Sequence, residues 1–212
     1  MQTLDFWYEF ASTYSYLSVM RIEEQARKAG ISVRWRPFLL GPIFAAQGWQ
    51  TSPFNLYPGK GRYMVRDMER MCAARGLAFS LPEPFPQNGL NAARLALLGD
   101  EEGWVAPFSR AVFAAQFGKA RQLDDRAMLT ECLEAVGAAP AQCFERITHH
   151  DIKDGLRAQT DTAQALGIFG APSFVTPDGE LFWGDDRLEQ AIAWTRAPGG
   201  NKSPAPQMRD RA

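Results

Sequence analysis

The chain has 212 residues, of which 46% are hydrophobic and 12% aromatic, so it can bury a core as one domain or as one domain with a large insertion. Its formal net charge of -1, with acidic and basic residues interspersed, offers neither a basic surface for nucleic acid nor a polybasic patch for membranes. The amino terminus lacks the pattern of a signal peptide, and no apolar run approaches the length of a membrane span. We expect a cytoplasmic protein that binds small molecules.

The amino-terminal segment predicts a strand, a helix and a second strand. Residues 4–10 are apolar and aromatic without glycine or proline, which is typical of a buried strand. Residues 13–29 have helical spacing and end at Gly30. Residues 31–38 alternate apolar and polar side chains. This order favours two parallel strands joined by a right-handed crossover.

The middle of the chain predicts helices only. Glycines and prolines interrupt residues 39–60, which we expect to be irregular, and prolines keep residues 81–86 extended. Helical spacing predicts five helices, at residues 62–75, 91–98, 104–117, 126–136 and 141–166.

The sheet returns near the carboxyl end. Residues 172–176 and 180–183 predict a hairpin, and Asp185 or Asp186 is expected to cap a last helix that ends at Trp194. Together the elements predict an α/β, thioredoxin-like fold with a large all-α insertion between its βαβ and ββα halves. The expected division is a discontinuous thioredoxin-like domain (residues 1–41 and 166–196), a helical insertion (42–165) and a disordered tail (197–212).

The junction between the first strand and the first helix carries Ser12-Thr13-Tyr14-Ser15. This is where thioredoxin-fold redox proteins place Cys-x-x-Cys, and two serines cannot shuttle electrons. Ser12 alone allows two interpretations: a cap for the helix, or a group that stabilises a thiolate or another anion at the helix amino terminus. If thiol chemistry occurs here, the thiol must come from elsewhere.

The cysteines and histidines of the chain do not suggest a metal site. Cys72, Cys132 and Cys143 are widely spaced, each in a predicted helix, so we interpret them as small buried hydrophobic residues. His149 and His150 are adjacent and would point in different directions on a helix, which favours surface positions or a cap.

Four motifs, read together and in order, resemble the 2-hydroxychromene-2-carboxylate isomerases. These enzymes are relatives of the kappa-class glutathione transferases within the DsbA-like group of helix-inserted thioredoxin folds. The resemblance runs from about residue 4 to residue 194, and the motifs are residues 10–17 (FASTYSYL), 36–41 (RPFLLG), 169–174 (FGAPSF) and 182–188 (FWGDDRL). It implies a glutathione-dependent cis-trans isomerase, a homodimer, that acts on an aromatic hydroxy-acid in aromatic catabolism.

The resemblance also implies how glutathione binds. Ser12 would be the catalytic residue, because its hydroxyl would donate a hydrogen bond to the glutathione thiolate and favour ionisation. Ala171-Pro172 would be a cis peptide, leaving the Ala171 backbone free to pair with the cysteinyl part of glutathione. An ordinary proline that starts an edge strand is the alternative.

Charged residues match the positions that hold the two ends of glutathione. Asp185 and Asp186 match those that bind the γ-glutamyl end, Asp186 better than Asp185, although an aspartate before a helix is often a cap. Lys60 resembles a lysine that starts the inserted helix and reaches the glycyl carboxylate. A solvated lysine without a specific role is the alternative.

Three residues depart from the family pattern. Ala45 stands where the isomerases commonly carry a lysine, Trp49 where asparagine is frequent, and Thr13 where proline is usual. Phe44 and Trp49 are candidates to line an aromatic substrate pocket. Asp186 and Lys60 favour glutathione binding, whereas Ala45 favours the alternative of a non-catalytic thioredoxin-fold binding protein. A kappa-like glutathione transferase is the second alternative.

Overall fold

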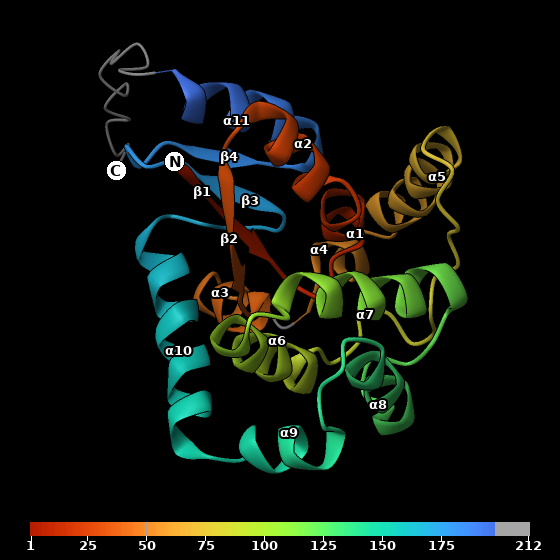
Figure 1. Ribbon diagram of the computed structural model, residues 1–212. Helices are drawn as coiled ribbons and strands as arrows, with labels where there is room; N and C mark the ends of the chain where they lie inside the picture. Colours follow the sequence, from red (N-terminus) through yellow and green to blue (C-terminus); the bar gives the residue numbers. More distant parts are fainter. Residues whose placement is uncertain (50, 198–212) are drawn as a thin grey trace.

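The computed structural model describes residues 1–49 and 51–197, so all of the predicted tail except Ala197 lies outside the described residues. Within them, one sheet has the strand order β2-β1-β3-β4 (Figure 1). Its strands are β1 (Thr3–Tyr8), β2 (Ser32–Pro37), β3 (Ser173–Val175) and β4 (Leu181–Trp183). β1 and β2 are parallel, and β3 is antiparallel to β1 and β4. The predicted α/β class, the parallel pair β1–β2 and the hairpin are confirmed, and the handedness of the crossover stays a prediction.

Helices make up most of the remaining described residues. No helix in the described residues is long and apolar enough to cross a bilayer. The helices are α1 (Thr13–Val19), α2 (Ile22–Ala29), α3 (Leu40–Ala46), α4 (Pro53–Leu56), α5 (Pro58–Ala74), α6 (Leu90–Glu102), α7 (Val105–Lys119), α8 (Arg126–Ala135), α9 (Pro140–Arg146), α10 (His150–Ala165), the 3-10 turn η1 (Asp185–Arg187) and α11 (Leu188–Arg196).

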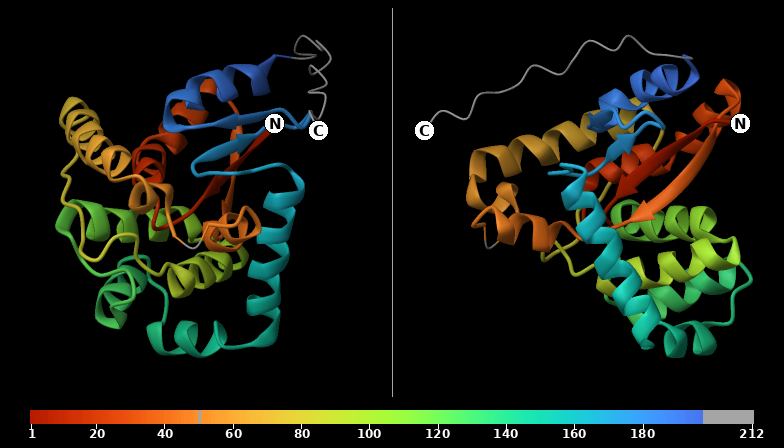
Figure 2. Two further views of the ribbon diagram at one scale, coloured as in Figure 1. Left: turned by 180° about the vertical axis from the view of Figure 1, so that it is seen from behind. Right: turned by 90° about the vertical axis from the view of Figure 1, so that its left-hand side faces the viewer.

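Both faces of the sheet are buried. Phe6 on β1 points to one face, where it stacks on Phe174 of β3 with ring centroids 5.5 Å apart, and α2 and α11 cover this face (Figures 1 and 2). Trp7 points to the other face, against Phe38 and Ile43, where α3 and α10 lie. Helices α6 to α9 group below the sheet in Figure 1, and α5 projects to one side. The division into domains stays a prediction.

One end of the sheet, which we call the site end, brings distant segments together. Tyr8 pairs with Pro37, Trp7 with Ser173, and Ser173 with Trp183. Strands β1, β2 and β4 therefore finish at the site end, and β3 begins there. Any residue that directly follows β1, β2 or β4, or directly precedes β3, lies at this end.

The single helix expected over residues 13–29 is wrong, because α1 ends at Val19 and α2 begins at Ile22. Arg21 has φ -134° and ψ -16°, outside helical geometry. The chain has no glycine or proline here to signal a break. At the break, Ser18 and Arg21 both bind the carboxylate of Asp185. Asp185 lies 164 residues after Arg21 in the sequence.

The irregular segment expected over residues 39–60 is also wrong, because it contains α3, α4 and the start of α5. Pro53 and Pro58 occupy the first helical positions of α4 and α5. Proline fits there, since its fixed φ suits a helix and its missing N–H is not needed in the first turn. These prolines start helices where they had been interpreted as breaks.

Two helix boundaries in the insertion also differ from prediction. Residues 141–166 form two helices, α9 and α10, and the Thr148 hydroxyl between them donates to the carbonyl of Glu145, which competes with helix continuation. Helix α6 continues through Gly99 to Glu102. A Cβ on Gly99 would lie 2.5 Å from the Trp104 ring, so this glycine permits close packing and does not end the helix.

Candidate functional site

Ser12 lies at the site end as the amino-terminal cap of α1. Its Oγ accepts a hydrogen bond from the Ser15 amide at 3.2 Å, so the cap interpretation is confirmed. The same hydroxyl donates to the carbonyl oxygen of Ala171 at 2.8 Å. The structure therefore joins two predicted site residues that are 159 positions apart.

The Ala171-Pro172 peptide bond is cis, as expected. It immediately precedes β3, and the Pro172 carbonyl accepts a hydrogen bond from the Gly184 amide at 3.0 Å. This bond connects the Ala171-Pro172 segment to the turn that carries the two aspartates. Hydrogen bonds thus link Ser12, the cis peptide and that turn at the site end.

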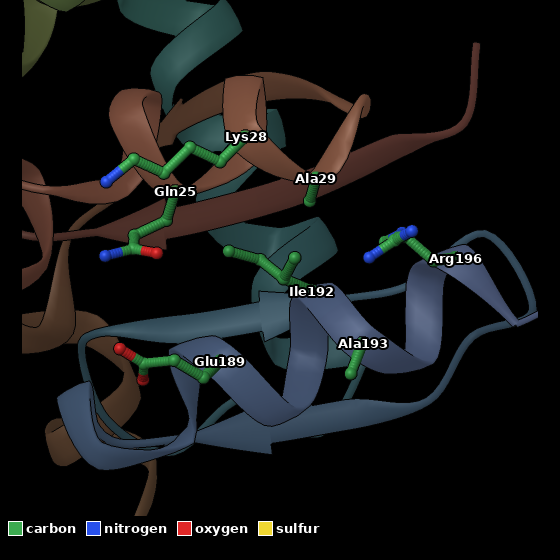
Figure 3. A pocket seen from close by; sticks show the side chains of 7 residues that line it. All are labelled: Gln25, Lys28, Ala29, Glu189, Ile192, Ala193 and Arg196. Atoms are coloured by element: carbon green, nitrogen blue, oxygen red, sulfur yellow. The ribbon is translucent and has the colours of Figure 1, made fainter.

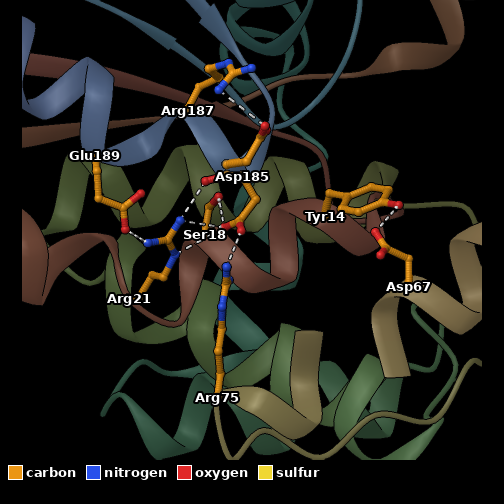
Figure 4. A network of polar contacts seen from close by, with 9 residues as sticks. Tyr14, Ser18, Arg21, Asp67, Arg75, Asp185, Arg187 and Glu189 are labelled. Carbon is orange, nitrogen blue, oxygen red and sulfur yellow. Dashed lines mark hydrogen bonds and ion pairs between the residues drawn. The ribbon is translucent and has the colours of Figure 1, made fainter. Parts of the chain in front are cut away.

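The two adjacent aspartates have opposite environments. The side chain of Asp185 is 1% exposed, and its oxygens accept hydrogen bonds from Ser18, Arg21 and Arg75 (Figure 4). The side chain of Asp186 is 68% exposed and lies 3.5 Å from the guanidinium of Arg187. Only Asp186 presents a carboxylate to a ligand in this arrangement.

The expectation that Asp185 or Asp186 caps the last helix is wrong. Both residues belong to η1, and Arg187 is the residue that precedes α11, without a side-chain capping bond. The Asp185 side chain turns toward the arginines instead.

Lys60 stands apart from the other predicted residues. It is exposed in the first turn of α5, and its Nζ lies 4.7 Å from the centre of the Tyr57 ring. In the described part of the chain, no hydrogen bond or ion pair links Lys60 to Ser12, Ala171 or Asp186. Its predicted contact with a ligand stays a prediction.

The two candidate substrate residues do meet. Phe44 lies on α3 and Trp49 follows it, with ring centroids 5.6 Å apart, and the Trp49 amide donates to the Phe44 carbonyl at 2.9 Å. Since α3 begins shortly after β2 ends, the segment that carries this aromatic pair starts at the site end. Ala45 is exposed beside Phe44.

A second aromatic pair, Phe169 and Trp183, was not predicted as part of the site. The two residues are 46% and 53% exposed, and their ring centroids lie 4.8 Å apart, edge to face. A Cβ on Gly170 between them would lie 2.4 Å from Trp183 Nε1, so the Trp183 ring covers the backbone next to Ala171. The signal was present in the FWG motif, where alternation on β4 puts Trp183 on the face opposite the buried Phe182.

Glu9 is a second residue that sequence reasoning missed. It lies between β1 and Ser12, is buried, and its main-chain carbonyl accepts from the Ser12 amide at 3.0 Å. Burial raises the pKa of its carboxyl to about 7, against a smaller lowering by the Ala11 amide. An acidic residue at the end of an apolar strand was the available signal.

The thiols of the chain lie elsewhere. As predicted, Cys72, Cys132 and Cys143 are buried, on α5, α8 and α9. Burial raises the pKa of Cys72 and of Cys132 to about 11 and raises that of Cys143. None of these cysteines is a thiolate at neutral pH, so none is a ready nucleophile.

A groove of about 250 Å³ between α2 and α11 contains none of the predicted site residues (Figure 3). Ala29 and Ile192 form its apolar part, and Lys28 and Glu189 flank it. Both flanking charges are already paired, Lys28 with Glu24 and Glu189 with Arg21. The site end remains the better candidate.

Comparison with known proteins agrees with the resemblance inferred from the motifs. A 2-hydroxychromene-2-carboxylate isomerase from Sphingobium xenophagum is 28% identical over 189 residues, covering 89% of this chain and 95% of the relative. A glutathione S-transferase kappa 2 from Caenorhabditis elegans is 20% identical over 210 residues and covers 93% of each chain. A solved structure of 2-hydroxychromene-2-carboxylate isomerase superimposes with a TM-score of 0.80 at 23% identity, over 90% of this chain and 93% of the other.

The model of the DSBA-like thioredoxin domain matches residues 3–192, which span the sheet, the insertion and the first five residues of α11. The predicted thioredoxin-like fold with a helical insertion is thereby confirmed, as is the resemblance to the isomerases and the kappa-class transferases. The chain belongs to the family of DSBA-like thioredoxin domains.

Proposed function

We propose that this chain is a glutathione-dependent cis-trans isomerase of the 2-hydroxychromene-2-carboxylate isomerase type, acting on an aromatic hydroxy-acid in aromatic catabolism. The observation that carries the proposal is the Ser12 hydroxyl, held against the Ala171 carbonyl at the position where redox relatives have a cysteine. The cysteines of the chain are buried in distant helices with raised pKa values. A thiol reaction at Ser12 therefore requires a thiol from a bound molecule.

The residues at the site end, together with Lys60 on α5, fit glutathione in charge and hydrogen bonding. Glutathione carries an ammonium group at its γ-glutamyl end, which suits the exposed Asp186 carboxylate. Its glycyl carboxylate suits Lys60. Its cysteinyl backbone suits the extended segment at Ala171, as an added strand would. Ala45 supplies no charge on α3, so Lys60 is the cation we assign to the carboxylate.

Ser12 changes hydrogen-bond partner in this proposal. Its hydroxyl hydrogen, now donated to the Ala171 carbonyl, would rotate toward the ligand sulfur, while Oγ keeps the Ser15 amide. The Ala171 carbonyl would then accept from the cysteinyl amide of the ligand. One rotation thus provides a donor for the thiolate and an acceptor for the ligand backbone, and a hydrogen bond to the charged form lowers the pKa of the thiol.

When bound, glutathione supplies a thiolate that adds reversibly to a conjugated double bond, so that the substrate can rotate about the resulting single bond before elimination. Phe44 and Trp49 would hold the aromatic ring of the substrate, since their rings already meet in α3 and its continuation. Ser12 stabilises the nucleophile throughout and forms no covalent bond.

The test combines calorimetric titration with reduced glutathione and an isomerase assay on 2-hydroxychromene-2-carboxylate. We expect saturable binding that Asp186→Ala weakens, with Asp124→Ala, at an exposed aspartate of the segment before α8, as the matched control. We expect Ser12→Ala to lower the glutathione-dependent rate about tenfold or more. No binding at millimolar glutathione would reject the proposal and favour a non-catalytic ligand-binding protein.

A kappa-like glutathione transferase is the second candidate, supported by the kappa relative that covers 93% of this chain. Both candidates use the same groups at Ser12 and Asp186 and differ in the product. Recovery of a stable glutathione adduct, with no isomerised product, would select the transferase. The homodimer and the cytoplasmic location stay predictions.

A further inference from the structure

The buried carboxylate of Asp185 joins segments that are far apart in the sequence. Its Oδ2 accepts from Arg75 Nη2 at 2.7 Å, and its Oδ1 accepts from Ser18 Oγ at 2.9 Å and from Arg21 Nε at 3.2 Å (Figure 4). Ser18 is on α1, Arg21 lies between α1 and α2, and Arg75 directly follows α5. One side chain thus connects the βαβ half, the helical insertion and the turn before α11.

The same network fixes the main chain next to Asp186. The Arg21 guanidinium also donates to the Asp185 carbonyl oxygen at 2.6 Å, so both the side chain and the backbone of Asp185 are held. On the other side, Gly184 has φ 109°, and a Cβ there would lie 2.6 Å from Asp186 Oδ1. The position of the exposed Asp186 carboxylate therefore depends on the residues that anchor Asp185.

Arg75 also fixes the helix that carries Lys60. Arg75 follows the last residue of α5, and Lys60 lies in its first turn. A second polar contact holds α5 against α1, because the Tyr14 hydroxyl donates to Asp67 Oδ2 at 3.0 Å (Figure 4). The two charges assigned to glutathione, Asp186 and Lys60, are thus connected through the contact between Arg75 and Asp185.

We propose that Arg75 and Asp185 are positioning residues that align the Lys60 end of α5 with the Asp186 turn, so that both ends of a glutathione-type tripeptide are bound together. The identity of the ligand rests on the function proposed above, whereas the alignment does not. Asp185 acts through the turn, without touching the ligand. Its burial and its three side-chain donors suit this role and leave Asp186 as the ligand-binding aspartate.

The test removes the Arg75 charge and compares the variant with a matched arginine on the same helix. Arg75→Met keeps an apolar stem of similar length, and Arg75→Lys keeps the charge. Arg66→Met is the control, because Arg66 is 68% exposed and its ion pair is local, with Glu69 three residues later. Hydrogen exchange at residues 184–187 and in the first turn of α5 reports alignment directly, and calorimetry with glutathione reports its consequence.

We expect Arg75→Met to speed exchange at residues 184–187 and to weaken glutathione binding about tenfold, while Arg66→Met matches the wild type. The rate at saturating glutathione should stay within about twofold, because Ser12 is not displaced, so the effect should appear in KM and not in kcat. Arg75→Lys should restore most of the affinity. A general loss of stability would not raise KM while leaving kcat unchanged, and it would not produce the rescue by Arg75→Lys.

Unchanged exchange at residues 184–187 in Arg75→Met would overturn the proposal, whatever the ligand. If the wild type does not bind glutathione, the function proposed above fails, and the exchange measurement still decides whether Arg75 and Asp185 position the turn. If glutathione binds equally well to Arg75→Met and to the wild type, the positioning role in binding is wrong while the cofactor assignment stands.

Discussion

The two ends of α1 each lie beside a buried carboxyl group, and the two groups are held in different ways. At the carboxyl end, Asp185 meets two guanidinium groups and the Ser18 hydroxyl. At the amino end, Glu9 is buried with the Ala11 amide as its hydrogen-bond donor, and no cation in the described part of the chain forms an ion pair with it. The same chemical group is thus an ionic anchor at one end and an uncompensated acid at the other.

The difference between Asp185 and Glu9 predicts that one group contributes mainly to stability and that the other makes the fold sensitive to pH. A buried carboxylate with cationic partners connects the segments that supply them. A buried carboxyl without a cation resists ionisation, and its pKa rises to about 7 for Glu9. The end of α1 that carries Ser12 should therefore change with pH near neutrality, whereas the end at Asp185 should depend on the presence of its arginines.

The largest expected effect comes from removing the anchor. Asp185→Asn should lower the free energy of unfolding by about 3 kcal/mol, because Arg21 and Arg75, whose side chains are 16% and 28% exposed, lose the buried carboxylate that they share. Urea unfolding measures the change. Asp186→Asn, one residue away on an exposed side chain, should change the stability by less than about 0.5 kcal/mol. Equal effects of the two substitutions would break the comparison.

The second effect tests the uncompensated end. The folded-state pKa of Glu9 is raised from 4.5 to about 7, so the folded protein holds a proton that the unfolded chain has lost. Its contribution to stability is full below the unfolded pKa and is lost as pH rises through about 7. The wild type should lose about 3 kcal/mol relative to Glu9→Gln between pH 4.5 and pH 8, measured by urea unfolding across that range. Parallel curves for the two proteins would contradict the assignment.

A smaller effect should come from crowding Glu9. A Cβ on Gly89 would lie 3.1 Å from Glu9 Oε1 and 3.3 Å from the Cβ of Phe10. The backbone of Gly89 is in an ordinary region, with φ -87°, so only packing opposes a side chain. Gly89→Ala should destabilise the protein by about 1 kcal/mol through overpacking. Less destabilisation in a Glu9→Gln background would show that the carboxyl is the group displaced.

The sheet and the position of Ser12 were predictable because their signals are local. The aromatic run before Ser12 indicates a buried strand, and the serine at its end indicates a cap. The Asp185 network was not predictable, since its partner Arg75 lies 110 residues away and nothing in the spacing connects the two. The break between α1 and α2 was not predictable for the same reason. Arg21 binds a carboxylate that is distant in the sequence, and no glycine or proline marks the break.

The prolines of residues 39–60 show a second reason why prediction from the sequence failed. Pro53 and Pro58 were interpreted as breaks, although proline is equally suited to the first position of a helix. The pattern was local but ambiguous. The exposed Phe169 and Trp183 were visible in the motifs, yet alternation alone does not say that both rings lie beside the cis peptide.

The most direct test of the central claim is the pKa of glutathione bound at Ser12, followed by the ultraviolet absorbance of the thiolate as pH changes. Ser12→Ala is compared with Ser52→Ala, because Ser52 caps α4 as Ser12 caps α1, so both substitutions remove a cap worth about 1 kcal/mol. We predict that the wild type and Ser52→Ala lower the pKa of the bound thiol by about one unit, and that Ser12→Ala does not. An equal pKa in all three proteins would contradict the role assigned to Ser12.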